Sequence, residues 1–327
     1  MKGFAAFLPL VLTVFTSCET AVEPKSEFID LPVVFGIITP SMLGSTVHTV
    51  VLSRSYDAPG NRPPDSVADR AIVGAALSLT VEGQNYPLTE VDDTLRRTAS
   101  DTLVRHFYRS PAIRFLPGHT ASLSALLPDG HRLLASTTTP PFLYFRRSYH
   151  FPRGISTQVR NFLDEDALTF SWEKRPEHLY WPSFRIVYQE TLDSGIVRNR
   201  TFEVPTEYVQ ENGKWVPVYP DYTWNDYISY SFDAIDSAMV NLSAGNPDKQ
   251  RFRIISAGFV VLTYDIHLSR YYASRRGSLD EYSIRTDQFV YSNIEGGLGV
   301  FGSRSTSSFD YEIDPRYALS FGYRSIN

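Results

Sequence analysis

The 327-residue chain contains a single cysteine, Cys18, and only three methionines. With one cysteine the chain forms no internal disulfide, so packing alone has to stabilise the fold. After the N-terminal segment, no hydrophobic run reaches the about 20 residues that a membrane-spanning helix needs. Acidic and basic residues, 36 and 31 in number, are interspersed. This argues against nucleic-acid binding, which would need a basic stripe on the surface.

Motifs for enzymatic chemistry are also lacking. The sequence contains no G-x-S-x-G, no H-E-x-x-H and no H-x-H, and its seven histidines fall in different segments. An activated nucleophile is therefore not indicated, and a zinc site would require residues that are far apart in the chain to assemble. We expect no catalytic residue, no cofactor and no metal. An enzyme would need a pocket with convergent Asp, Glu or His side chains.

One stretch does fit a cofactor pattern, because Gly297, Gly299 and Gly302 have the G-x-G-x-x-G spacing of dinucleotide-binding loops. That motif requires a helix directly after it, whose N-terminal amides face the phosphates. Here residues 303–308 make a poor helix start, and residues 309–313 alternate like a strand. We therefore expect these glycines to form a tight turn between strands, at a place where side chains would collide.

Residues 1–17 have the features of an export signal, with Lys2, an apolar run over residues 3–15 and small residues before Cys18. The segment Phe15-Thr16-Ser17-Cys18 resembles the lipobox of bacterial lipoproteins. The resemblance implies that Cys18 becomes the acylated N-terminus, which holds the protein on a membrane, with residues 18–27 as a polar tether. The alternative is a buried free cysteine, which the polar residues that follow do not favour.

The pattern of the remaining chain predicts an all-β protein. The many aromatic residues, 21 Phe and 20 Tyr among them, favour strands over helices. Residues 28–141 hold six short β-type runs, separated by turn signals at residues 58–65, 82–85 and 128–130, which predict an immunoglobulin-like sandwich. These runs are residues 33–38, 46–54, 76–82, 103–108, 121–127 and 133–139.

Thr139-Pro140-Pro141 is a stiff boundary, after which we expect a second antiparallel β domain over residues 142–327. Its predicted strands are residues 143–151, 167–172, 183–190, 198–204, 215–219, 227–232 and 252–264. One short helix is expected at residues 265–275, where apolar side chains recur near helical spacing.

The order of these features resembles a family of Bacteroidota-type envelope lipoproteins known only as a domain of unknown function. Its C-terminal signature, S-N-I-x-x-G-L-G-V-F-G, is matched by Ser292-Asn293-Ile294 and residues 297–302, and residues 50–54 and 116–120 match more loosely. The resemblance implies a lipid-anchored outer-membrane protein, often encoded beside TonB-dependent receptors. No catalytic residue comes with it.

The segment at residues 214–227 is the strongest candidate for binding. It carries five aromatic residues among polar ones: Trp215, Tyr219, Tyr222, Trp224 and Tyr227. Flat apolar faces for stacking, combined with polar groups for orientation, are typical of sites for a glycan or a peptide. The alternative is that these rings only pack within strands.

We therefore expect a membrane-anchored, non-catalytic accessory lipoprotein that binds a partner receptor or a ligand in an outer-membrane uptake system. The alternative is a structural or adhesive scaffold of the cell envelope. A TonB-dependent receptor gene beside this one would favour the first function.

Overall fold

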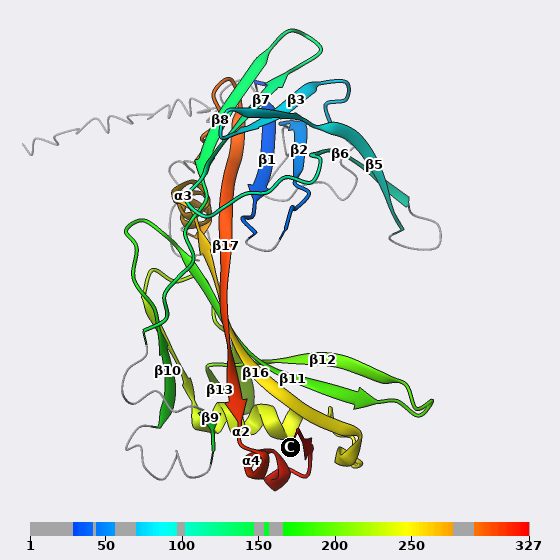
Figure 1. Ribbon diagram of the computed structural model, residues 1–327, viewed down its shortest axis with the longest axis vertical. Helices are drawn as coiled ribbons and strands as arrows, with labels where there is room; N and C mark the ends of the chain where they lie inside the picture. The colour runs from blue at the N-terminus through cyan, green and yellow to red at the C-terminus, as the bar shows by residue number, and fades with distance from the viewer. Residues whose placement is uncertain are drawn as a thin grey trace, which may run out of the picture.

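The computed structural model describes residues 29–41, 44–55, 70–96, 102–146, 154–156, 166–276 and 291–326. Figure 1 shows two β-rich lobes at opposite ends of the long axis, joined by long strands. The all-β prediction is confirmed, with several antiparallel sheets and few helices. Within the described ranges, no helix combines the length and apolarity needed to cross a membrane.

The upper lobe in Figure 1 has two layers of strands around one core. The first layer contains β1 (Pro32–Ile38), β2 (Thr49–Arg54), β6 (Thr102–Arg109) and β5 (Thr89–Arg96), and the second contains β4 (Gln84–Pro87), β3 (Ala76–Val81), β7 (Thr120–Leu126) and β8 (Arg132–Thr138). Alternate residues of these strands, such as Val34, Leu79 and Leu123, are buried between the layers. The lobe is therefore a β-sandwich.

One long strand, β17 (Leu298–Ile313), serves both lobes. Its first part pairs in parallel with β1, from Val33 opposite Leu298 to Ile38 opposite Ser303. Its later part pairs antiparallel with β16 (Phe252–Tyr264) in the other lobe. Because Ile294 and Phe301 are buried in the upper core, residues 28–141 do not complete that core by themselves.

The lower lobe has a core rich in aromatic side chains. Phe170 stacks on Phe259 with 4.1 Å between ring centroids, and Trp172 is fully buried beside Phe259. The lobe consists of β9 (Gly154–Ile155), β10 (Ala167–Ser171), β11 (Tyr180–Thr191), β12 (Val197–Val204), β13 (Glu207–Glu211), β14 (Lys214–Val218), β15 (Tyr227–Ser231), β16, β18 (Arg324–Ser325), α2 (Phe232–Asn241), η1 (Lys249–Arg251) and α4 (Pro315–Ser320).

Helix α3 (Ile266–Arg276) lies where the lobes meet, at the position predicted for a helix. Asp265 precedes it, and its carboxylate accepts a hydrogen bond from the backbone of Leu268 and another from the hydroxyl of Thr137 on β8. Burial raises the pKa of the Asp265 carboxyl, while these hydrogen bonds lower it. One buried side chain thus caps α3 and connects it to the upper lobe.

The sequence pattern did not predict every element. It missed the helices α2 and α4, and it missed the strands β4, β5, β9, β13 and β18. Residues 143–146 form only an isolated bridge, Phe145 to Trp172, and the rest of the strand predicted at 143–151 lies outside the described residues. The loop predicted at 58–65 also lies outside them.

Candidate functional site

Four of the five aromatic residues singled out in the sequence are exposed. Trp215 is 69% exposed, Tyr227 53%, Tyr219 47% and Trp224 41%. Exposed tryptophan and tyrosine rings offer a flat apolar face with a polar tip, which is why these residues are enriched at interfaces. These side chains therefore satisfy the first requirement of a binding surface.

Trp215 lies on a two-stranded hairpin, β13–β14, whose tight turn is formed by Asn212 and Gly213. Both residues have positive φ, 49° and 77°. Asn-Gly is the residue pair preferred for two-residue hairpin turns, because both central positions need such angles. In the resulting register Trp215 is paired with Gln210, and Tyr208 is paired with Pro217. Tyr208 and Trp215 therefore belong to the same face of the hairpin.

A groove of about 640 Å³ lies between this hairpin and helix α2. Its lining consists of Glu207, Tyr208, Trp215, Ser231, Asp233, Ala234, Ser237 and Asn241. The helix contributes Asp233, Ser237 and Asn241, which are four residues apart and so form one stripe along its surface. The opposite face of α2 packs into the core through Ile235 and Met239.

Aromatic and acidic side chains line the groove. Two carboxylates, from Glu207 and Asp233, lie with two aromatic rings, and no lysine or arginine is among the described lining residues. Near the groove, burial raises the pKa of Tyr219, and the charges of Tyr208 and Glu203 add to the shift. Such a groove favours ligands with hydroxyl or ammonium donors and a flat apolar face, and it disfavours anions.

The structure does not bring all five aromatic residues together. Tyr222 packs into a cluster at the junction of the lobes, stacked on Tyr272 with centroids 4.9 Å apart and tilted against Trp181 at 4.9 Å. Its role is therefore structural. Tyr219, Trp224 and Tyr227 are exposed but are not among the residues that line the groove. Of the five predicted residues, Trp215 is the one that lines it.

The three glycines predicted to form a turn lie mostly in a strand, which corrects that prediction. Glu295 forms an isolated bridge with Leu134, the chain turns at Gly296 and Gly297, and β17 begins at Leu298. Gly297 therefore lies in the turn as predicted, whereas Gly299 and Gly302 lie within the strand. The strand is continuous here because β1 pairs with it residue by residue. No helix follows Gly302, so the geometry of a dinucleotide-binding loop is not present in this segment.

Close approach of other chain segments explains the glycines. A Cβ on Gly299 would overlap the carbonyl oxygen of Val34, and φ at Gly299 is +108°. A Cβ on Gly302 would lie 2.5 Å from Cγ of Leu268 in α3. These glycines therefore let β1 and α3 pack directly on β17.

Asn293, in the same signature, pairs with β17 through its side chain. Its Nδ2 donates to the carbonyl oxygen of Phe301 (2.8 Å), and its Oδ1 accepts from the amide of Phe301 (3.0 Å). The side-chain amide of Asn293 thus makes the two hydrogen bonds with the backbone of Phe301 that a neighbouring strand would otherwise make. The residues of the signature therefore hold β1, α3 and the start of β17 together.

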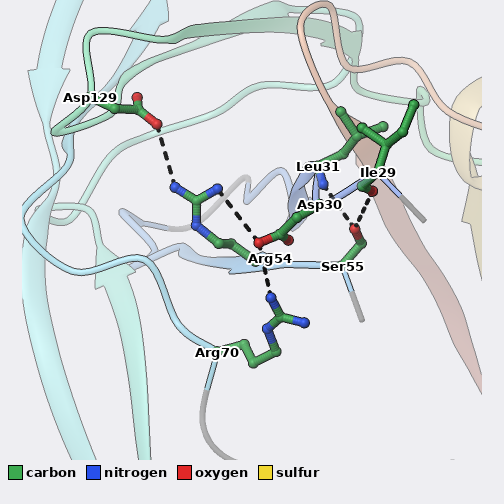
Figure 2. Close-up of polar contacts among 7 residues, drawn as sticks. All are labelled: Ile29, Asp30, Leu31, Arg54, Ser55, Arg70 and Asp129. Atoms are coloured by element: carbon green, nitrogen blue, oxygen red, sulfur yellow. Dashed lines mark hydrogen bonds and ion pairs between the residues drawn. The ribbon is translucent and has the colours of Figure 1, made fainter. Parts of the chain in front are cut away.

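The first described residues are held against the upper lobe by backbone and side-chain hydrogen bonds (Figure 2). The amide of Ser55 donates to the carbonyl oxygen of Leu31 (2.8 Å), and the amide of Leu31 donates to Oγ of Ser55 (2.9 Å). The Ser55 hydroxyl also donates to the carbonyl oxygen of Ile29 (3.3 Å). The chain therefore enters the fold at the end of β2.

Charged side chains reinforce this entry point, as Figure 2 shows. The carboxylate of Asp30 lies 2.9 Å from Arg70 and 3.9 Å from Arg54, and Arg54 also reaches Asp129 at 3.4 Å. Each pair is partly exposed and contributes little alone. Together they hold residues 29–31 against the end of β2. Cys18 itself lies outside the described residues.

Comparison with known proteins gives a family and no named relative. No curated protein matches the chain. The model of a family described as a domain of unknown function (DUF4249) matches residues 22–310. This range takes in both lobes, the aromatic groove and most of β17. The chain belongs to the DUF4249 family of proteins with a domain of unknown function.

Proposed function

We propose that this protein is a membrane-anchored envelope lipoprotein that acts as a non-catalytic accessory subunit in an outer-membrane uptake system. In this proposal, acylated Cys18 anchors it in the outer membrane, and the groove beside Trp215 binds a partner receptor or its ligand. The export signal and lipobox at residues 1–18 support the anchor. The expectation of a TonB-dependent receptor as partner rests on the family resemblance in the C-terminal signature.

The observation that carries the binding function is the exposure of Trp215, which lines the groove and is 69% exposed to solvent. Covering about 150 Å² of an aromatic side chain stabilises a complex by up to roughly 4 kcal/mol. Tryptophan and tyrosine at the centre of an interface commonly dominate its binding energy. Trp215 and Tyr208 have the chemistry and the position for this role.

The placement of the groove supports the same function. The chain enters the fold in the upper lobe, whereas β13 and α2, which form the groove, lie in the lower lobe (Figure 1). A tether of residues 18–27 reaches about 30 Å at full extension, so the upper lobe would stay close to the membrane. The groove would then be held at the other end of the molecule, where a partner could approach it.

The test is purification of the lipoprotein from native membranes with whatever partner co-purifies. We expect Trp215→Ala to lose the partner while the protein stays folded and membrane-bound. Tyr144→Ala is the matched control, because Tyr144 is 76% exposed and does not line the groove. Equal recovery of the partner with wild type and Trp215→Ala would reject the groove as the binding site and leave the scaffold function in its place.

A further inference from the structure

Three side chains with metal-binding atoms converge on one face of the ribbon formed by β5 and β6 in the upper lobe. Glu90 and Asp92 are two residues apart on β5, and His106 is directly opposite Asp92 on β6. Residues at these positions share a face, because side chains alternate along each strand. One ligand atom from each of the three lies within 4.8 Å of the other two.

Glu90 is held in place by the structure around it. Its Oε2 accepts a hydrogen bond from the backbone amide of Gly74 (2.8 Å) and lies 3.4 Å from the hydroxyl of Tyr108. Tyr108 is buried and its hydroxyl donates to the carbonyl oxygen of Ile72 (2.8 Å). Both contacts use Oε2, so Oε1 is left for a ligand. Outer contacts of this kind orient carboxylates in metal sites.

His106 is in direct contact with one of the two carboxylates, that of Asp92. Nδ1 of His106 lies 2.5 Å from Oδ1 of Asp92. The second carboxylate, Glu90, is held in the same small space by Gly74 and Tyr108. The three groups thus place one imidazole beside two carboxylates, and each of the three can offer a ligand atom to the same cation.

We propose that Glu90, Asp92 and His106 bind a divalent transition-metal ion, with water completing its coordination. One imidazole nitrogen and two carboxylate oxygens form a donor set that suits Zn²⁺ and related first-row ions. Ca²⁺ and Mg²⁺ prefer oxygen ligands throughout. The ion would take the place of the direct His106–Asp92 contact and would connect β5 to β6. This site is separate from the groove and does not depend on the proposed function.

The test is a calorimetric titration of the purified full-length protein with ZnCl₂. Wild type is expected to bind one ion, and His106→Gln, Glu90→Gln and Asp92→Asn are each expected to weaken binding by at least about tenfold, since even the loss of an outer-shell contact costs that much. Mg²⁺ and Ca²⁺ in excess should not displace zinc. The three variants are independent, so the test survives if one of them fails to fold.

His119→Gln provides the matched control. His119 also lies next to a carboxylate, with Nδ1 3.4 Å from Glu82, but this pair belongs to no cluster of three ligands found among the described residues. The variant His119→Gln should therefore bind zinc with the same affinity as wild type. Zinc should also raise the unfolding temperature of wild type and His119→Gln but not of His106→Gln. The proposal is overturned if wild type takes up no zinc, or if His119→Gln weakens binding as much as His106→Gln.

Discussion

Replacing Gly299 by alanine should seriously destabilise the protein, although it adds only one methyl group. The new Cβ would overlap the carbonyl oxygen of Val34, which belongs to the neighbouring strand β1. Backbone φ at Gly299 is +108°, a conformation that costs a residue with a side chain about 1–3 kcal/mol. Moving β1 away from β17 would also weaken one or two ladder hydrogen bonds, each worth about 1 kcal/mol. We therefore expect a loss of about 2–5 kcal/mol in the free energy of unfolding.

The matched control is Gly258→Ala in β16. A Cβ at Gly258 would have no atom within 4 Å, and its φ is not in the positive region. Its expected effect is within about 0.5 kcal/mol. Equilibrium urea unfolding, followed by circular dichroism, measures both variants against wild type. If Gly299→Ala is destabilised no more than Gly258→Ala, the close approach of β1 to β17 is not what requires this glycine.

Three further predictions concern other parts of the chain. Trp215→Ala should leave the unfolding temperature nearly unchanged because the side chain is exposed, whereas Trp172→Ala should cost about 3–5 kcal/mol because that side chain is fully buried; similar unfolding temperatures would contradict the assignment. Burial lowers the pKa of His48 from 6.5 to about 4. The neutral ring is therefore favoured in the fold, and the stability it contributes is fully present above pH 6.5 and is lost, by about 3 kcal/mol, as the pH falls to about 4. His48→Gln should remove this part of the pH dependence in urea unfolding, and an unchanged profile would refute it. Cys18→Ala should leave the protein uncleaved or outside the membrane fraction, and normal cleavage with membrane retention would contradict the lipid anchor.

The strands and turns that depend on local sequence were predictable. The turn expected at residues 82–85 is formed by Glu82 and Gly83, both with positive φ, and the turn at 128–130 has Gly130 with φ +86°. Helix α3 was predicted from the spacing of its apolar residues, and three of them, Leu268, Tyr271 and Tyr272, pack in the junction. In each case the residues that determine the structure are neighbours in the chain.

Features that depend on distant residues were not predictable. The turn expected at Gly297, Gly299 and Gly302 is mostly strand because β1, more than 250 residues earlier, pairs with this segment.

Helix α2 was missed, although the i, i+4, i+8 spacing of Asp233, Ser237 and Asn241 was a signal for it.

In the candidate sites, too, features set by neighbouring residues were predictable and features set by distant residues were not. The sequence singled out Trp215, which is exposed, together with Tyr222, which could not be assigned to the junction without knowing that Tyr272 stacks on it. The cluster of Glu90, Asp92 and His106 depends on the register between β5 and β6. A search for metal-binding motifs in the sequence cannot find this cluster, because the register between the two strands is known only from the structure.

The most direct test of the central claim is site-specific photo-crosslinking in living cells. A photoreactive phenylalanine analogue is placed at Trp215 in one strain and at Tyr144 in another, since both positions are exposed and only Trp215 lines the groove. After irradiation, the membrane fraction is probed for adducts of the lipoprotein. We expect a specific adduct from position 215 and none from position 144. No adduct from position 215, or the same adducts from both positions, would contradict the claim that the groove binds the partner.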